Sequence, residues 1–186
     1  MVLCWLVLAS VHLYRKKPWK TPALKLDWTS MVGFAAICVT FVIVALWRRE
    51  RFTPIVQLGV PIEIALKAAT IALGFGSVWI NLAALRTLGK QWTVAAKLVE
   101  GHRLVTEGLY GVVRHPIYDA NFMLLLATGL AFSRLCALLL AILLFWIGAA
   151  IRIRSEEKLL REAFGQEFEA YARRVPALFP RLHRDS

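Results

Sequence analysis

Hydrogen-bonding and aromatic side chains gather in one short polar stretch, residues 101–122, which lies between long apolar runs. Two histidines and two tyrosines fall within 17 residues: His102, Tyr110, His115 and Tyr118. Such side chains can bind charged or aromatic groups of a ligand. Because His115 directly precedes Pro116, its backbone is biased away from helix and towards a turn. The pattern predicts a polar ligand site at the edge of a membrane, although isolated histidines are often ordinary hydrogen-bonding partners.

A second pair of chemically useful side chains, Arg152 and Glu156, occurs where the last apolar run ends. Their spacing of four residues puts them on one face of a helix. One interpretation is an ordinary ion pair at the membrane boundary, with the arginine reaching towards lipid headgroups. The other is a site for charged parts of a ligand. On spacing alone the ordinary ion pair is favoured.

The composition of the 186 residues indicates an integral membrane protein. Hydrophobic residues make up 59% of the chain, the mean hydropathy is +0.59, and the apolar residues form blocks rather than stripes. A block of about 20 residues can cross a bilayer as a helix. The net charge of +11 lies in the gaps between blocks, where membrane topology explains it, and no recognition motif suggests nucleic acid. No cysteine spacing typical of a metal site occurs.

The predicted fold is all-α, with about five transmembrane helices. The predicted spans are residues 1–14, 28–47, 61–85, 118–132 and 135–151. Residues 152–174 alternate charged and apolar positions at helical spacing, which predicts an amphipathic C-terminal helix on the membrane or on the connector. Near the start of the third span, Glu63 and Lys67 form an i, i+4 pair, interpreted as a satisfied structural ion pair.

The distribution of Lys and Arg predicts the orientation. With the N-terminus outside, 18 of these residues fall on the inner side and four on the outer side. The connector at residues 86–117 and the tail would then both be cytoplasmic, in the plasma membrane if the cell is bacterial. The chain therefore divides into N-terminal membrane helices, residues 1–85, and a region that carries the chemistry, residues 86–186.

Two separated motifs resemble the isoprenylcysteine carboxyl methyltransferase family. They are L-V-T-E-G-x-Y-x-x-x-R-H-P-x-Y at residues 104–118 and R-x-x-x-E-E-x-x-L-x-x-x-F-G-x-E-F-x-x-Y at residues 152–171. The resemblance covers about residues 88–181, and the related phospholipid methyltransferases share much of the pattern. It implies a membrane-embedded enzyme that uses S-adenosylmethionine without a Rossmann domain. Consistently, the sequence has no strand-linked G-x-G-x-x-G fingerprint.

By motif position, the resemblance also implies roles for individual residues. The residues implied to bind S-adenosylmethionine, and its product S-adenosylhomocysteine, are His102, Arg103, Leu104, Val105, Tyr110, His115, Pro116, Ile117, Tyr118 and Glu156. Arg152 is implied to lie near a substrate carboxylate, which makes Arg152 and Glu156 the expected catalytic pair. No metal is implied.

The acceptor is expected to be a lipophilic or lipidated molecule that enters from the bilayer, such as a prenylcysteine carboxylate. A carboxylate is already anionic at neutral pH and needs a cation rather than a base. The alternative is a phospholipid amine, which would have to lose a proton to a base such as Glu156 or a histidine. A transporter or assembly factor is the third hypothesis. Asp119 and Asn121 stand where many relatives have a small residue, which could reshape the mouth of the site.

Overall fold

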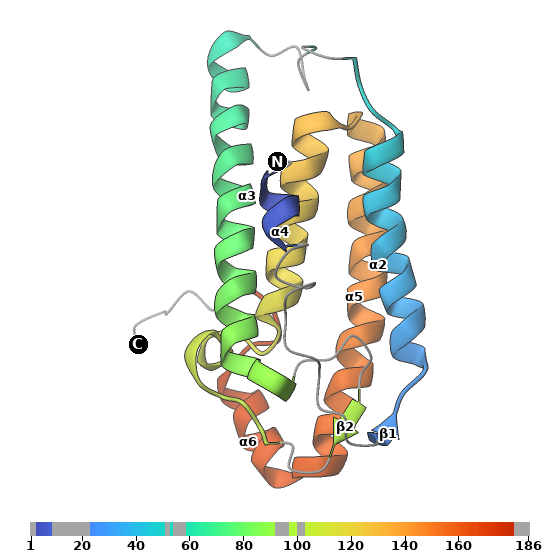
Figure 1. Ribbon diagram of the computed structural model, residues 1–186, viewed down its shortest axis with the longest axis vertical. Coiled ribbons are helices and arrows are strands. Elements are labelled where there is room, and N and C mark those ends of the chain that lie inside the picture. Colours follow the sequence, from blue (N-terminus) through green and yellow to red (C-terminus); the bar gives the residue numbers. More distant parts are fainter. Residues whose placement is uncertain are drawn as a thin grey trace.

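The computed structural model describes residues 3–8, 23–50, 53, 59–91, 97–99 and 103–180. Long helices running side by side dominate this part of the chain (Figure 1). They are α2 (Thr29–Leu46), α3 (Val60–Leu88), α4 (Pro116–Phe132) and α5 (Leu135–Phe164). A shorter helix, α6 (Gln166–Arg174), turns back across one end of the bundle. Residues 3–8 are also helical; the rest of the first predicted span lies outside the described residues.

Short elements collect at the same end of the bundle as α6 (Figure 1). Strands β1 (Ala23–Leu26) and β2 (Lys97–Val99) pair antiparallel. Two 3-10 turns, η1 (Gly89–Gln91) and η2 (Gly108–Gly111), belong to the connector between α3 and α4. The predominantly helical fold confirms the predicted class, to which the small two-stranded ladder is an unpredicted addition.

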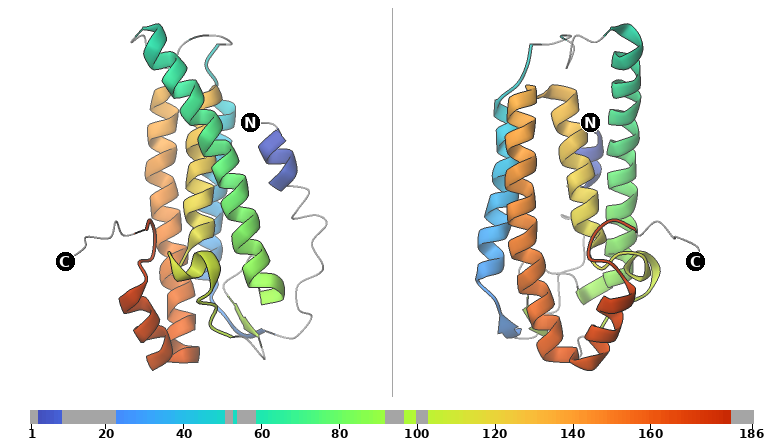
Figure 2. Two further views of the ribbon diagram at one scale, coloured as in Figure 1. Left: turned by 90° about the vertical axis from the view of Figure 1, so that its left-hand side faces the viewer. Right: turned by 180° about the vertical axis from the view of Figure 1, so that it is seen from behind.

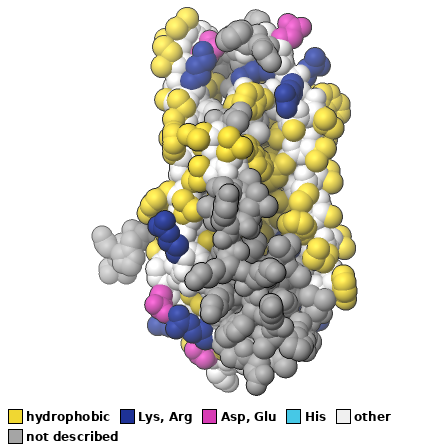
Figure 3. Space-filling model, in the orientation of Figure 1, with side chains coloured by type: hydrophobic (Ala, Val, Ile, Leu, Met, Phe, Trp, Pro, Cys, Tyr) yellow, Lys and Arg dark blue, Asp and Glu magenta, His cyan; other side chains and the backbone are white. Residues whose placement is uncertain are grey.

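The flanks of the bundle are suited to lipid. Among the described residues, α2, α3 and α5 are long and apolar enough to cross a membrane, and α4 is a shorter apolar helix. Large apolar side chains remain exposed along these helices, among them Val39, Phe75, Trp79 and Leu143, and apolar side chains cover much of the flank seen in Figure 3. The chain is therefore a membrane protein. Five spans remain a prediction.

The helix that follows the last apolar run differs from the prediction. Instead of starting at residue 152, the C-terminal helix is interrupted only at Gly165, so residues 152–164 continue α5. The reason is local: residues 152–164 contain neither Gly nor Pro, whereas Gly165 has a φ of 48° that favours glycine. Arg152 and Glu156 consequently stand on the same rigid helix that forms the last apolar span.

The end of the bundle opposite α6 is tightly connected. Residues Ser133 and Arg134 join α4 to α5, as predicted. The Arg49 guanidinium donates to the carbonyls of Leu130 (2.9 Å) and Ala131 (3.0 Å), so a cation caps the C-terminus of α4. At the start of α3, Lys67 and Glu63 form the predicted ion pair at 2.9 Å, with 70% and 31% of their side chains exposed.

The contact between α2 and α5 depends on two glycines beside Arg152. A Cβ on Gly33 would lie 2.6 Å from the Gly148 carbonyl oxygen and 2.7 Å from Cγ of Arg152. We expect Gly33→Ala to destabilise the protein by about 1–3 kcal/mol, because the backbone of α5 would have to move. Gly76→Ala is the matched control: its Cβ would meet only the flexible end of Met123, at 2.7 Å.

Thermal unfolding of both variants in the same lipid or detergent checks this expectation. Gly76→Ala should be neutral or slightly stabilising, because alanine favours helix by about 0.5–1 kcal/mol over glycine. Equal stability of the two variants would contradict the tight helix crossing.

Candidate active site

The turn before α4 is formed by Arg114 and His115, and α4 begins at Pro116. Proline suits the first position of a helix because its missing N–H would have no partner there. The backbone N–H of Arg114 donates to the Pro176 carbonyl (2.8 Å), and that of His115 donates to the Ala177 carbonyl (3.0 Å). The segment that follows α6 therefore holds this turn through backbone hydrogen bonds.

Tyr118, Glu156 and Arg152 form a closed triangle of hydrogen bonds. The Tyr118 hydroxyl donates to Oε1 of Glu156 at 2.5 Å and accepts from Nε of Arg152 at 2.5 Å. Nη2 of Arg152 reaches the same Glu156 oxygen at 3.0 Å. Tyr118 and Arg152 are buried, whereas 26% of the Glu156 side chain is exposed. Glu156 is thus the accessible member of a buried charged group.

Helix α2 also contributes to the surroundings of Arg152. Nη1 of Arg152 donates to the Ser30 carbonyl oxygen at 3.3 Å. The guanidinium lies 5.6 Å from the ring centroid of Phe34 and 5.8 Å from that of Tyr118, both within the range of cation–π attraction. The sequence motifs gave no sign of α2 here, since its residues Ser30 and Phe34 lie far from them in the chain.

His115 lies between two carboxylates of α5. Its Nδ1 is 3.6 Å from Oε2 of Glu156, and its Nε2 is 3.2 Å from Oε1 of Glu157. Burial of the ring favours its neutral form, but hydrogen bonds to both glutamates and their negative charges outweigh burial and raise the pKa of His115. The two carboxylates thus stabilise the protonated form of the ring.

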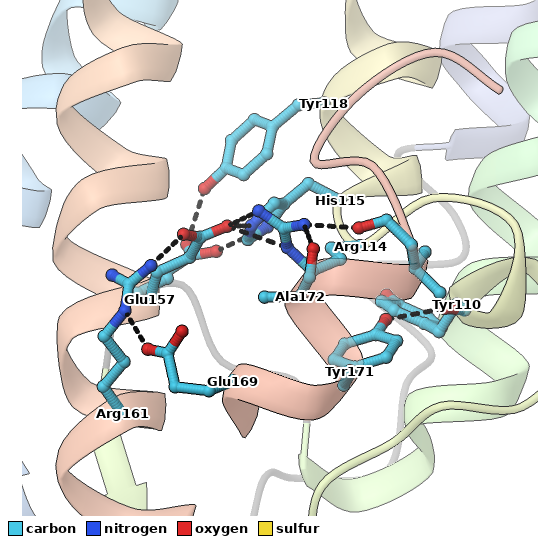
Figure 4. A network of polar contacts seen from close by, with 11 residues as sticks. Tyr110, Arg114, His115, Tyr118, Glu157, Arg161, Glu169, Tyr171 and Ala172 are labelled. Atoms are coloured by element: carbon cyan, nitrogen blue, oxygen red, sulfur yellow. Dashed lines mark hydrogen bonds and ion pairs between the residues drawn. The ribbon is translucent and has the colours of Figure 1, made fainter. Parts of the chain in front are cut away.

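Glu157 is the centre of a second charged group (Figure 4). Its Oε1 accepts from Arg114 at 3.0 Å (Nε) and 2.7 Å (Nη2), and its Oε2 accepts from Arg161 at 3.1 Å. Arg161 in turn donates to Glu169 of α6 at 2.8 Å. With 9% of its side chain exposed, Glu157 is a buried carboxylate surrounded by cations.

Helix α6 is attached to the connector by two further contacts. Nη1 of Arg114 donates to the carbonyls of Ala172 (3.0 Å) and Val175 at the C-terminal end of α6. The Tyr171 hydroxyl donates to the Tyr110 carbonyl at 2.6 Å (Figure 4). Burial raises the pKa of Tyr171 to about 12, so it remains a donor at physiological pH.

The apolar residues of the first motif pack against two different helices, α3 and α6. Val105 and Tyr110 are buried together against Ala84 of α3, with Ile117 packed beside them. Leu104 instead packs against the cluster of Phe168, Tyr171 and Val175 around α6. The motif thus connects α3 on one side with α6 on the other.

The predicted site residues fall into three groups. Those in or beside the charged groups are His115, Pro116, Tyr118, Arg152 and Glu156; those in the apolar clusters are Leu104, Val105, Tyr110 and Ile117. Arg103 lies at the surface, where it pairs with Glu107 at 3.7 Å, apart from the charged groups. His102 lies outside the described residues.

The sequence reasoning missed two residues that the charged groups depend on, Arg114 and Glu157. Both were within the quoted motifs, as the Arg of R-H-P and the second Glu of E-E. The two consecutive glutamates, Glu156 and Glu157, were the signal in the sequence that could have identified Glu157. Two adjacent glutamates on a helix point about 100° apart. Here one faces Tyr118 and the other faces Arg114.

A bundle of apolar helices with buried charged groups at one end defines an integral membrane protein with a polar candidate site. The sequence model of the isoprenylcysteine carboxyl methyltransferase (ICMT) family matches residues 70–162. This stretch is half of the chain and carries most of α3, all of α4 and α5 up to Glu162. The chain belongs to this family.

Individual relatives have two kinds of name. The cobalt-zinc-cadmium resistance protein CzcN of Cupriavidus metallidurans is 36% identical over 115 residues, which are 60% of this chain and 50% of the relative. Protein-S-isoprenylcysteine O-methyltransferase of Schizosaccharomyces pombe is 35% identical over 115 residues, which are 60% of this chain and 49% of the relative. Isoform B of the corresponding Arabidopsis thaliana protein is 33% identical over 99 residues, 52% of this chain and 50% of the relative. The chain spans about half the length of these curated relatives.

Proposed function

We propose that the protein is a membrane methyltransferase that moves the methyl group of S-adenosylmethionine to a lipophilic acceptor, most simply the carboxylate of a prenylcysteine-like molecule. The observation that carries the proposal is the Tyr118–Glu156–Arg152 triangle beside His115, because it puts an accessible carboxylate and a buried cation at the end of apolar helices. All four residues lie within the stretch that matches the family.

The residues present fit S-adenosylmethionine chemically. The cofactor combines an apolar aromatic base with a cationic sulfonium and a zwitterionic amino acid. Val105, Tyr110 and Ile117 offer an apolar cluster, and Glu156 offers negative charge with partial exposure. His115, as a hydrogen-bond donor, would suit the carboxylate of the cofactor. When bound, the cofactor would supply a methyl group activated by the positive sulfur.

The chain's own residues would act by orientation and charge. Methyl transfer is an in-line displacement, so most of the rate would come from holding two reactants in place. Arg152 would face the acceptor carboxylate, and the aromatic faces of Phe34 and Tyr118 would keep its guanidinium in position. A carboxylate acceptor requires no general base. A phospholipid amine, the alternative acceptor, would require one, for which Glu156 is the candidate.

The proposal includes the orientation of the chain. The site elements, β1, β2 and α6 all lie at one end of the bundle (Figure 2). Together with the excess of Lys and Arg on that side in the sequence, this supports a cytoplasmic site and an external N-terminus. Residues 86–186 would then be the catalytic region, and residues 1–85 the membrane helices, with α2 supporting Arg152.

Methyl transfer from labelled S-adenosylmethionine tests the function and the acceptor together. The purified protein in lipid nanodiscs is offered a farnesylated cysteine, a fatty acid or phosphatidylethanolamine. We expect label in the farnesylated cysteine that base releases, as a methyl ester would. Base-stable label in phosphatidylethanolamine would replace the carboxylate by the amine acceptor. Transfer to none of them, with no binding of S-adenosylhomocysteine, would overturn the function.

A further inference from the structure

The segment after α6, residues 175–180, lies against the turn before α4; we call it the C-terminal strap. It is outside the stretch that matches the family, which ends at residue 162. Two of its carbonyls, those of Pro176 and Ala177, accept from the backbone N–H groups of Arg114 and His115 at 2.8 and 3.0 Å. These N–H groups precede α4 and have no partner within the helix. The strap supplies partners that water would otherwise provide.

Asp119 fixes the strap at a third point. Its Oδ2 accepts from the backbone N–H of Phe179 at 3.1 Å, and 8% of Asp119 is exposed. Its other oxygen is buried and has no hydrogen-bond partner among the described residues. A buried carboxylate with a single hydrogen-bond donor is energetically unfavourable, so the presence of Asp119 in the first turn of α4 needs an explanation.

The strap is also held by aromatic packing and by an unusual backbone conformation. The ring of Phe179 lies 5.7 Å from that of Trp146 and 6.4 Å from that of Phe122, between centroids. Phe179 has a φ of 48°, the only positive φ of a non-glycine residue in the described part of the chain. Bulky residues rarely adopt this conformation unless surrounding contacts enforce it. The Asp119 bond and the aromatic contacts are the enforcing contacts here.

The strap also affects the position of His115. Asp119 stands one helical turn after His115, and the strap bonds to both residues. His115 must point towards α5 to lie between its two glutamates. If the strap were released, the turn could rotate and the ring could leave the carboxylates.

We propose that Asp119 is a positioning residue: by anchoring the strap, it orients His115 towards α5 and so sets the affinity for the cofactor. That Asp119 anchors the strap and orients His115 does not depend on any enzyme activity. That it sets the affinity for the cofactor rests on the proposed function.

Hydrogen exchange and S-adenosylhomocysteine binding, measured on the same variants of the full chain in nanodiscs, test the two halves. For Asp119→Ala we expect amide exchange at Arg114 and His115 to accelerate by about tenfold, and the Kd for S-adenosylhomocysteine to rise by about tenfold, as loss of a bond to a charged group implies. Asp119→Asn should keep both within about threefold of the wild type, because an amide oxygen can still accept from Phe179.

Two further variants complete the test. Phe179→Ala retains the N–H but loses the ring contacts, and we expect about a threefold change in the same direction in both measurements. Glu63→Gln, at the opposite end of the bundle, should change neither. It is the control.

Each outcome decides the proposal. Unchanged exchange in Asp119→Ala would overturn it, and so would an Asp119→Asn variant as damaged as Asp119→Ala, since charge rather than the strap bond would then matter. Faster exchange with unchanged affinity would limit Asp119 to a structural role. If the wild type fails to bind S-adenosylhomocysteine, the proposed function fails, whereas hydrogen exchange still reports whether Asp119 anchors the strap.

Discussion

Replacing Glu157 by Ala is expected to lower the free energy of unfolding by about 3–5 kcal/mol, because it leaves buried cations without their carboxylate. Arg114 loses its two hydrogen bonds to Oε1, at 3.0 and 2.7 Å, and only 12% of its side chain is exposed to water that could replace them. The effect should extend to α6, since Arg114 also holds the carbonyls at the end of that helix. Chemical or thermal unfolding in a fixed detergent measures the change.

Two variants separate charge from hydrogen bonding at this position. Glu157→Gln retains an oxygen that can accept from Arg114 but removes the charge, so we expect a smaller loss of about 1.5–3 kcal/mol. Glu167→Ala, an exposed glutamate of α6, should change stability by less than about 0.5 kcal/mol. A loss below about 1 kcal/mol for Glu157→Ala would mean that the charged group is solvated and contributes little.

The sequence predicted helices α2 to α5 and their order, because apolar blocks of that length have few other structures in a membrane. It also predicted a turn at His115, because a proline disfavours helix at the preceding residue, although α4 begins at Pro116 rather than at the predicted residue 118. The predicted start of the C-terminal helix, at residue 152, was wrong. The composition changes from apolar to charged at Arg152, whereas the helix itself ends only at Gly165, where the backbone changes.

The partners of the site residues were harder to predict than the residues themselves. The motifs contain Tyr118, Arg152 and Glu156, and the structure brings these three into direct contact. Contacts with Ser30 and with the C-terminal strap join segments that are far apart in the chain, and no local pattern encodes them. They follow from how α2 packs on α5 and how α6 folds back, and both depend on tertiary packing rather than on periodicity.

The largest effects on activity are expected from Glu156→Gln and Arg152→Lys. The first should weaken binding of the cofactor, and the second should raise the KM for the acceptor. Glu156→Gln preserves the shape and an acceptor for the Tyr118 hydroxyl but removes the charge that would face the cationic cofactor. We expect the Kd for S-adenosylmethionine to rise by about 10–100-fold, as for loss of a charged hydrogen bond. Binding calorimetry measures the Kd, and initial rates of methyl transfer give the accompanying loss of activity.

Arg152→Lys keeps the positive charge but loses the planar guanidinium, which donates to Tyr118, Ser30 and Glu156 at once. We expect the KM for the acceptor to rise by about tenfold or more while cofactor affinity changes by less than about threefold, because under the proposed function this cation would face the acceptor. Lys67→Arg, on the exposed pair at the far end of α3, is the control and should leave both constants unchanged. If Arg152→Lys weakened the cofactor and spared the acceptor, the two roles would have to be exchanged. The acceptor would then meet Glu156, which is the arrangement that an amine rather than a carboxylate requires.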